Sequence, residues 1–172
     1  GGALLADDAG LGKTYVALAL AAEARRPLLV LPSALRPTWR AAMERAGVRV
    51  PVRTHESLSR ALDGEDAGAS HDLVVVDEAH QARTRETRRW RALARLTRGA
   101  RVLLLTATPV HNARRELESL LALFLGARAH DAPDALLARC IVRRERDDAV
   151  QLPFAAMLAP PRTMRSAAPA IA

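Results

Sequence analysis

The stretch DDAGLGKT, residues 7–14, follows the apolar run ALLA at 3–6 and leads directly into an alanine- and leucine-rich segment, residues 13–25. A strand, a glycine-rich loop and a helix in this order are typical of a phosphate-binding loop, because glycines let backbone N–H groups turn toward phosphate oxygens and the helix N-terminus adds partial positive charge. Asp7 stands where the usual G-x-x-x-x-G-K-[ST] pattern has its first glycine. A glycine-rich turn that only caps a helix is therefore the alternative.

The side chains of this loop predict its chemistry. Lys13 is placed to reach the β- and γ-phosphates of a nucleotide, and the Thr14 hydroxyl to bind Mg²⁺. Lys13 is also the only lysine among the 26 basic residues. In a chain that otherwise uses arginine, a lysine marks a position that arginine does not serve. The other loop residues predicted to surround the phosphates are Asp8, Gly10, Leu11 and Gly12.

Three continuous apolar runs predict strands that are buried on both faces, which is typical of a parallel sheet. They are LLVL at 28–31, VVV at 74–76 and VLLL at 102–105. Residues 48–54 contain Pro51 and predict an edge strand. Helical patterns lie between the strands, at 34–46, 86–98 and 112–125, the last with Gly126 as its stop. The alternation predicts an α/β fold, a mostly parallel sheet with helices on both faces.

The second motif is Asp77-Glu78-Ala79-His80, directly after the apolar run 74–76. A carboxylate at the end of a buried strand is suited to hold Mg²⁺ beside a phosphate loop, and a second carboxylate next to it could activate a water molecule. The alternative is a helix start, where acidic residues are also favoured. The third motif, Thr106-Ala107-Thr108-Pro109, again follows a strand. Its hydroxyl groups are suited to hydrogen-bond both the acidic motif and nucleic acid. The alternative is that the segment forms only a polar turn.

Composition narrows the function. The chain carries 26 basic and 19 acidic residues, a net charge of +7 that suits a polyanion such as nucleic acid. The arginine-rich run 83–98 is interpreted as a solvated surface, with DNA binding as the alternative, and Trp90 as a core anchor.

The excess of arginine and alanine predicts a bacterial source. One cysteine excludes an intramolecular disulfide, and the longest uncharged stretch, 149–161, is too short to span a bilayer. We expect a cytoplasmic protein without a membrane partner.

Taken together, the motifs resemble those of helicase superfamily 2, in its Swi/Snf-like branch of double-stranded DNA translocases. ADDAGLGKT at 6–14, DEAH at 77–80 and LLLTATPVHN at 103–112 resemble motifs I, II and III, and the acid at Asp7 is typical of that branch. LLVLPSALRPTW at 28–39 and RTHESLSR at 53–60 resemble motifs Ia and Ib, and VRRERDD at 142–148 resembles the LRR-x-K-x-D segment. The DEAH-box RNA helicases share motif II but usually have GSGKT and SAT, so they fit less well.

The resemblance implies a RecA-like P-loop NTPase lobe that binds ATP and Mg²⁺ and contacts duplex DNA through its phosphates. It implies that Lys13 and Thr14 bind the ATP phosphates and magnesium, that Asp77 binds magnesium and that Glu78 activates water. His80, Thr106 and Thr108 would link the ATP site to DNA. The residues that would follow the DNA backbone are Pro32, Ser33, Thr54 and Ser57.

The resemblance covers residues 1–153, which we expect to form one RecA-like lobe, followed by a disordered proline- and alanine-rich segment, 154–172. The upstream segment that contacts adenine in this family is not present, and nothing resembles motifs IV to VI. A second RecA-like lobe with its arginine finger must then come from outside these residues. We expect a motor lobe of a DNA-stimulated ATPase that is nearly inactive alone. The alternative is a non-catalytic ATP- or DNA-binding remnant or a regulatory fragment.

Overall fold

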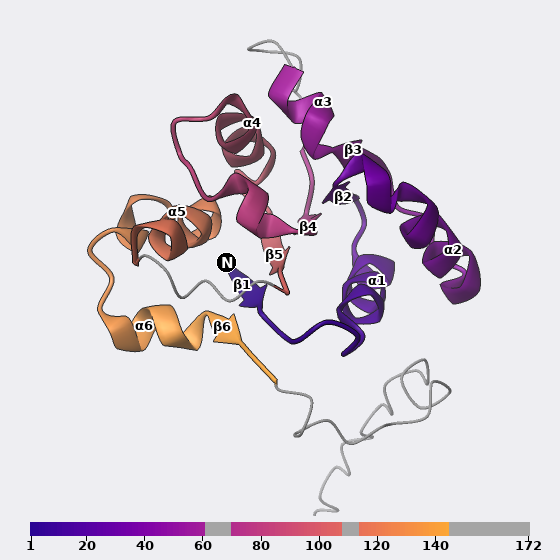
Figure 1. The fold of residues 1–172 in the computed structure, drawn as a ribbon, viewed down its shortest axis with the longest axis horizontal. Coiled ribbons are helices and arrows are strands. Elements are labelled where there is room, and N and C mark those ends of the chain that lie inside the picture. Colours follow the sequence, from indigo (N-terminus) through magenta and orange to yellow (C-terminus); the bar gives the residue numbers. More distant parts are fainter. Residues whose placement is uncertain (61–69, 108–113, 145–172) are drawn as a thin grey trace, which may run out of the picture.

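A parallel sheet lies at the centre of the computed structural model, which describes residues 1–60, 70–107 and 114–144 (Figure 1). Its six strands follow the order β3-β2-β4-β5-β1-β6, and every pairing is parallel. The predicted parallel α/β fold is therefore confirmed. The strands are β1 (Gly2–Leu5), β2 (Pro27–Leu31), β3 (Val52–Thr54), β4 (Leu73–Val76), β5 (Arg101–Leu105) and β6 (Ile141–Val142).

Helices cover both faces of this sheet. Figure 1 shows α1 (Lys13–Glu23) and α2 (Arg36–Ala46) on one side and α4 (Arg88–Leu96) and α5 (Arg114–Leu125) on the other. Two shorter helices join the second side, α3 (His55–Arg60) and α6 (Asp134–Arg139). Three short 3₁₀ segments complete the described chain: η1 (Ser33–Leu35), η2 (Ala79–Ala82) and η3 (Gly126–Ala129).

Strand residues alternate between two apolar cores, as the period of a strand requires. In β5, Val102 and Leu104 pack with α4 and α5, whereas Leu103 and Leu105 pack with α1 and α2. The other central strands divide in the same way. A strand that is buried on both faces must be apolar at every position, which is why the runs at 28–31, 74–76 and 102–105 show no polar alternation.

The predicted boundaries differ from the observed ones in a few places. The edge strand is confirmed but spans only Val52–Thr54, and the helix predicted at 86–98 begins at Arg88 because the Thr87 side chain accepts a hydrogen bond from the Trp90 N–H. The two six-residue helices α3 and α6 and the two-residue strand β6 were not predicted, because such short elements contain too few residues to show a period. Within the described residues, no helix is long and apolar enough to cross a membrane.

Leu104 provides a test of this packing. It is fully buried in β5, between β1 and β4, so Leu104→Ala should lower the free energy of unfolding by about 3 kcal/mol through lost transfer energy and the cavity left behind. Leu136→Ala is the matched control, because Leu136 lies 40% exposed on α6 and the same truncation there should cost less than about 0.5 kcal/mol. Urea unfolding followed by circular dichroism measures both. Equal losses would contradict the two-core packing.

Candidate active site

The loop between β1 and α1 has the backbone of a phosphate-binding loop. Gly10 and Gly12 have φ angles of 88° and 78°, in the left-handed region that glycine enters without a steric penalty. Gly12 is the N-cap of α1, so the N-terminus of this helix forms the end of the loop. Lys13 Nζ donates to the main-chain oxygens of Asp7 and Asp8, at 2.6 and 2.9 Å. These two bonds hold the ammonium group over the loop, and Thr14 lies next to it in the first turn of α1.

The acidic motif lies where β4 ends. The Asp77 N–H still donates to Val30 of β2, and Asp77 Oδ1 accepts from the Glu78 N–H at 2.9 Å. Glu78 has φ 48° and ψ 48° and is the one non-glycine residue with positive φ in the described part of the chain. This left-handed conformation costs about 1 kcal/mol or more, and such costs gather at functional sites. Glu78 is also the N-cap of the short 3₁₀ segment η2, without a side-chain capping bond, so the acidic motif does begin one helical turn, as the alternative had it.

His80 joins the acidic motif to the third motif. Its Nδ1 lies 3.1 Å from Glu78 Oε2 and 3.4 Å from Thr106 Oγ1. Thr106 is buried directly after β5. Motifs II and III are thus in contact through the side chains of His80 and Thr106. Thr108 lies outside the described residues.

The sheet order brings the three motifs to one edge. β5 lies between β1 and β4, and Leu105 of β5 is level with Leu5 of β1 and with Asp77 after β4. Two strand spacings therefore separate the phosphate loop from Asp77, roughly 10 Å between backbones. Parallel strands end on the same side, so the loop, the acidic motif and Thr106 face a common crevice at the carboxyl edge, where open α/β sheets bind ligands.

Two buried donors from other elements converge on Asp77. Trp39 of α2, only 2% exposed, donates from Nε1 to Asp77 Oδ2 at 2.7 Å. His55, the fully buried first residue of α3, bonds the main-chain oxygen of Asp77 through Nε2 at 2.7 Å. A carbonyl oxygen only accepts, so Nε2 is protonated. Burial lowers the pKa of His55 from its usual value, which keeps the ring neutral. The sequence segments that resemble motifs Ia and Ib contain Trp39 and His55, but the sequence alone assigned no role to either residue.

The segments predicted to contact DNA are tied to each other. The N–H of Ser33, at the start of η1, donates to both carboxylate oxygens of Glu56, at 3.3 and 3.1 Å. At the start of α3, Thr54 Oγ1 accepts from the Ser57 N–H and Ser57 Oγ accepts from the Thr54 N–H. Ser33 is exposed and Pro32 is buried. The Thr54 and Ser57 hydroxyls are thus engaged in capping α3, and their contact with DNA stays a prediction.

Asp7 has a structural contact that the sequence did not reveal. Its side chain is fully buried and accepts hydrogen bonds from the backbone N–H, Nε and Nη2 of Arg144, at 2.8, 2.9 and 2.5 Å. This bond raises the pKa of Arg144. The acid that breaks the strict glycine pattern therefore fastens the phosphate loop to the chain that follows β6. A signal was available, since Asp7 and Arg144 both lie in segments singled out by the resemblance.

The arginine-rich run contains structural residues as well as exposed ones. Arg89 donates to Ser59 of α3 and to the main-chain oxygen of Gln81, both at 3.1 Å. Trp90 packs against the core, and its Nε1 donates to the Ser119 main-chain oxygen at 2.9 Å. The Arg85 guanidinium lies 5.0 Å from the centre of the Trp90 ring. The interpretation of Trp90 as a core anchor is confirmed.

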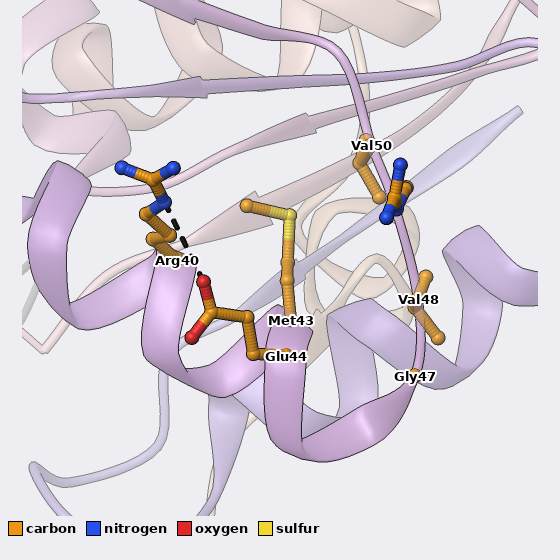
Figure 2. A pocket seen from close by; sticks show the side chains of 7 residues that line it. Arg40, Met43, Glu44, Gly47, Val48 and Val50 are labelled. Carbon is orange, nitrogen blue, oxygen red and sulfur yellow. Dashed lines mark ion pairs between the residues drawn. The ribbon is translucent and has the colours of Figure 1, made fainter.

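A pocket of about 640 Å³ lies elsewhere, beside the C-terminal half of α2 (Figure 2). Figure 2 shows Met43 and Val50 along it, with the Arg40–Glu44 ion pair of 3.5 Å at one side. Both charged side chains of this pair are highly exposed, so it contributes little stability. The pocket lining includes no residue of the phosphate loop, the acidic motif or Thr106, so this pocket is not the candidate nucleotide site. That site lies at the carboxyl edge of the sheet, where the three motifs meet.

The residues at that edge suit a nucleotide with magnesium. Glycines of positive φ, a helix N-terminus and a lysine ammonium group form the phosphate side, and one carboxylate, Asp77, lies opposite. Within residues 1–60, 70–107 and 114–144, no three His, Cys, Asp or Glu side chains gather as a metal cluster. Mg²⁺ fits this arrangement, because it is usually held by one or two carboxylates together with phosphates and water. Fold and site together define a RecA-like P-loop NTPase lobe.

Comparison with known proteins gives the family. The SNF2-related domain family matches residues 29–134, which is more than half of the chain. The chain therefore belongs to this family, and it is the N-terminal RecA-like lobe of a Swi/Snf-like ATPase core of helicase superfamily 2. The family resemblance and the fold expected from the sequence are both confirmed.

Individual relatives come from animals and bacteria. The chain is 35% identical over 141 residues to the SWI/SNF-related matrix-associated actin-dependent regulator of chromatin subfamily A-like protein 1 of Xenopus tropicalis, covering 69% of this chain and 15% of that protein. It is 34% identical over 167 residues to the RNA polymerase-associated protein RapA of Yersinia pestis, covering 74% of this chain and 17% of that one. The chain thus spans about a sixth of these relatives. The predicted bacterial source is not supported by them, because similar proteins include those of animals.

The fold also matches solved structures. The Sulfolobus solfataricus SWI2/SNF2 ATPase core in complex with dsDNA superposes with a TM-score of 0.67 at 21% identity. The match covers 86% of this chain and 41% of that one. At this identity the likeness establishes the fold of the lobe.

Proposed function

We propose that the chain is the first motor lobe of a DNA-stimulated ATPase that uses ATP hydrolysis to move along duplex DNA. The observation that supports this most strongly is the arrangement of the phosphate loop, Asp77–Glu78 and Thr106 at the carboxyl ends of three neighbouring strands. The family and the DNA-bound archaeal structure of the same fold support the same function.

Each residue at the edge takes a defined part in this proposal. Lys13 binds the β- and γ-phosphates with its ammonium group, and the glycine-rich loop from Asp8 to Gly12 surrounds the phosphate oxygens. Thr14 and Asp77 hold Mg²⁺, which when bound neutralises the charge on the phosphates. These groups position the nucleotide and stabilise charge, which is most of what phosphoryl transfer requires of a protein.

Glu78 is the proposed general base. It accepts the proton of a water molecule, and its carboxylate is about one third exposed, so that water has access to it. His80 Nδ1 lies beside both this carboxylate and the Thr106 hydroxyl, so one ring nitrogen connects the proposed base to motif III. A change at Thr106 caused by DNA would therefore move the group that holds the base.

DNA binding is proposed to use phosphate contacts along one strand. Ser33 is exposed at the start of η1 and the chain is strongly basic, and both features suit contacts with phosphates instead of base edges. The parent protein is proposed to work without a membrane partner and in the cytoplasm. A second RecA-like lobe is proposed to complete the ATP site.

The test is phosphate release by the two-lobe protein with and without duplex DNA. We expect DNA of any sequence to stimulate release, and the half-saturating DNA concentration to rise roughly 100-fold between about 50 and 200 mM salt if about four phosphates are contacted. Duplexes of shuffled sequence are the control. Stimulation by one sequence that persists at high salt would contradict phosphate-based binding, and absence of any stimulation would favour a non-catalytic remnant.

A further inference from the structure

Asp77 is bonded by both segments that are proposed to contact DNA. Trp39 belongs to the first turn of α2, which continues directly from η1 and Ser33. His55 begins α3 directly after Thr54. Trp39 Nε1 bonds the Asp77 carboxylate and His55 Nε2 bonds the Asp77 main-chain oxygen, each at 2.7 Å. The two donors therefore act on different groups of one residue.

These contacts are short, buried and directional. Trp39 is 2% exposed and His55 is fully buried, so neither bond competes with bulk water. A hydrogen bond to an ionised carboxylate is stronger than one between neutral groups, and low local dielectric strengthens it further. Among the described residues, the carboxylate also accepts from the Glu78 N–H at Oδ1, a contact that comes from the same strand end. Trp39 is thus the long-range donor that sets how the Asp77 carboxylate is turned.

The two segments that are proposed to contact DNA are also hydrogen-bonded to each other. The Ser33 N–H donates to both oxygens of Glu56, which follows His55 directly in α3. Hydrogen bonds of the Glu56 and Ser33 backbone N–H groups lower the pKa of Glu56, so its carboxylate stays ionised. η1 and α3 are thus tied together, and the chain bonds Asp77 through Trp39, just after η1, and through His55, the first residue of α3.

We propose that Trp39 and His55 are positioning residues that hold Asp77 for magnesium, and that DNA occupancy reaches the magnesium site through these two hydrogen bonds. This inference rests on the proposed function and adds a route to it that is separate from the His80–Thr106 contact. Because linkage is reciprocal, magnesium-nucleotide binding must strengthen DNA binding by the same factor by which DNA strengthens nucleotide binding.

The test measures binding in the full-length protein, with the non-hydrolysable analogue AMP-PNP in a calorimeter. Affinity is measured in Mg²⁺ and in EDTA, and each with and without saturating duplex DNA. Trp39→Phe keeps the aromatic packing and removes the N–H donor. We expect it to reduce the gain in affinity due to Mg²⁺ by about 5- to 10-fold, and the gain due to DNA similarly, while affinity in EDTA stays within about twofold.

The chain offers a matched control. Trp90→Phe removes the same N–H from a tryptophan that bonds Ser119 away from the site, and it should change neither gain. At the other donor, His55→Gln retains an amide N–H and should keep both gains, whereas His55→Leu should reduce them as Trp39→Phe does. If circular dichroism shows that Trp39→Phe does not fold, the two His55 variants test the proposal in its place.

The outcomes separate this inference from the proposed function. If the wild-type protein shows no gain from Mg²⁺ and none from DNA, the proposed function fails. If the wild type shows both gains and Trp39→Phe and His55→Leu retain them, the coupling route is wrong and the proposed function stands. If the variants lose affinity equally in EDTA and in Mg²⁺, the two residues act only in folding, which also overturns the inference.

Discussion

Cutting the two-lobe protein back to these 172 residues should lower DNA-stimulated phosphate release by about 10³- to 10⁵-fold, the range that an arginine finger contributes to phosphoryl transfer. The described residues supply the phosphate loop, Asp77 and Glu78 from one sheet edge. In this family resemblance the finger belongs to the second lobe, so the transition-state charge lacks that partner in the isolated chain. Phosphate release in single-turnover experiments measures the loss.

Two measurements make this loss interpretable. Circular dichroism should show that the 172 residues are folded, and calorimetry should show that they still bind magnesium-nucleotide weakly through the Lys13 loop. Supplying the second lobe as a separate chain should recover part of the rate. Brisk turnover by the isolated chain, unaffected by a change at Glu78, would contradict both the two-lobe mechanism and the choice of base.

Glu78→Gln in the two-lobe protein should lower phosphate release by about 10²- to 10⁴-fold, because the amide has the shape of the carboxylate but accepts no proton from water. Nucleotide affinity should change by about twofold or less, since Lys13 and the loop are untouched. Glu23→Gln is the matched control, because Glu23 lies exposed at the far end of α1 and should leave the rate unchanged. A rate loss matched by an equal loss of affinity would make Glu78 a binding residue instead.

Lys13→Arg provides the contrasting outcome. Lys13 Nζ uses two of its three N–H groups on the Asp7 and Asp8 oxygens, 2.6 and 2.9 Å away, within a tight turn. A planar guanidinium cannot place its donors in that compact geometry. Nucleotide binding should therefore fall together with phosphate release, whereas Glu78→Gln separates the two.

The buried strands and the phosphate loop could be predicted because their signals are local. A strand covered on both faces must be apolar at each position, as in 74–76 and 102–105, and Gly10 and Gly12 are required where φ is positive. The same logic placed Asp77 and Thr106 at strand ends. The short α3 lacked a hydrophobic period, although its capping pair, Thr54 and Ser57, was present in the sequence.

The sequence by itself therefore determined the parallel α/β fold, the family and the residues at the carboxyl edge. Only the tertiary structure decided which distant side chains support them: Trp39 lies 38 residues from Asp77, His55 lies 22 residues from it, and Arg144 lies 137 residues from Asp7. The physical reason is that these contacts depend on the strand order β3-β2-β4-β5-β1-β6. Apolar runs and turn residues specify that strands form and where they end, but the order arises from packing helices of particular lengths against both faces, and no local pattern records it.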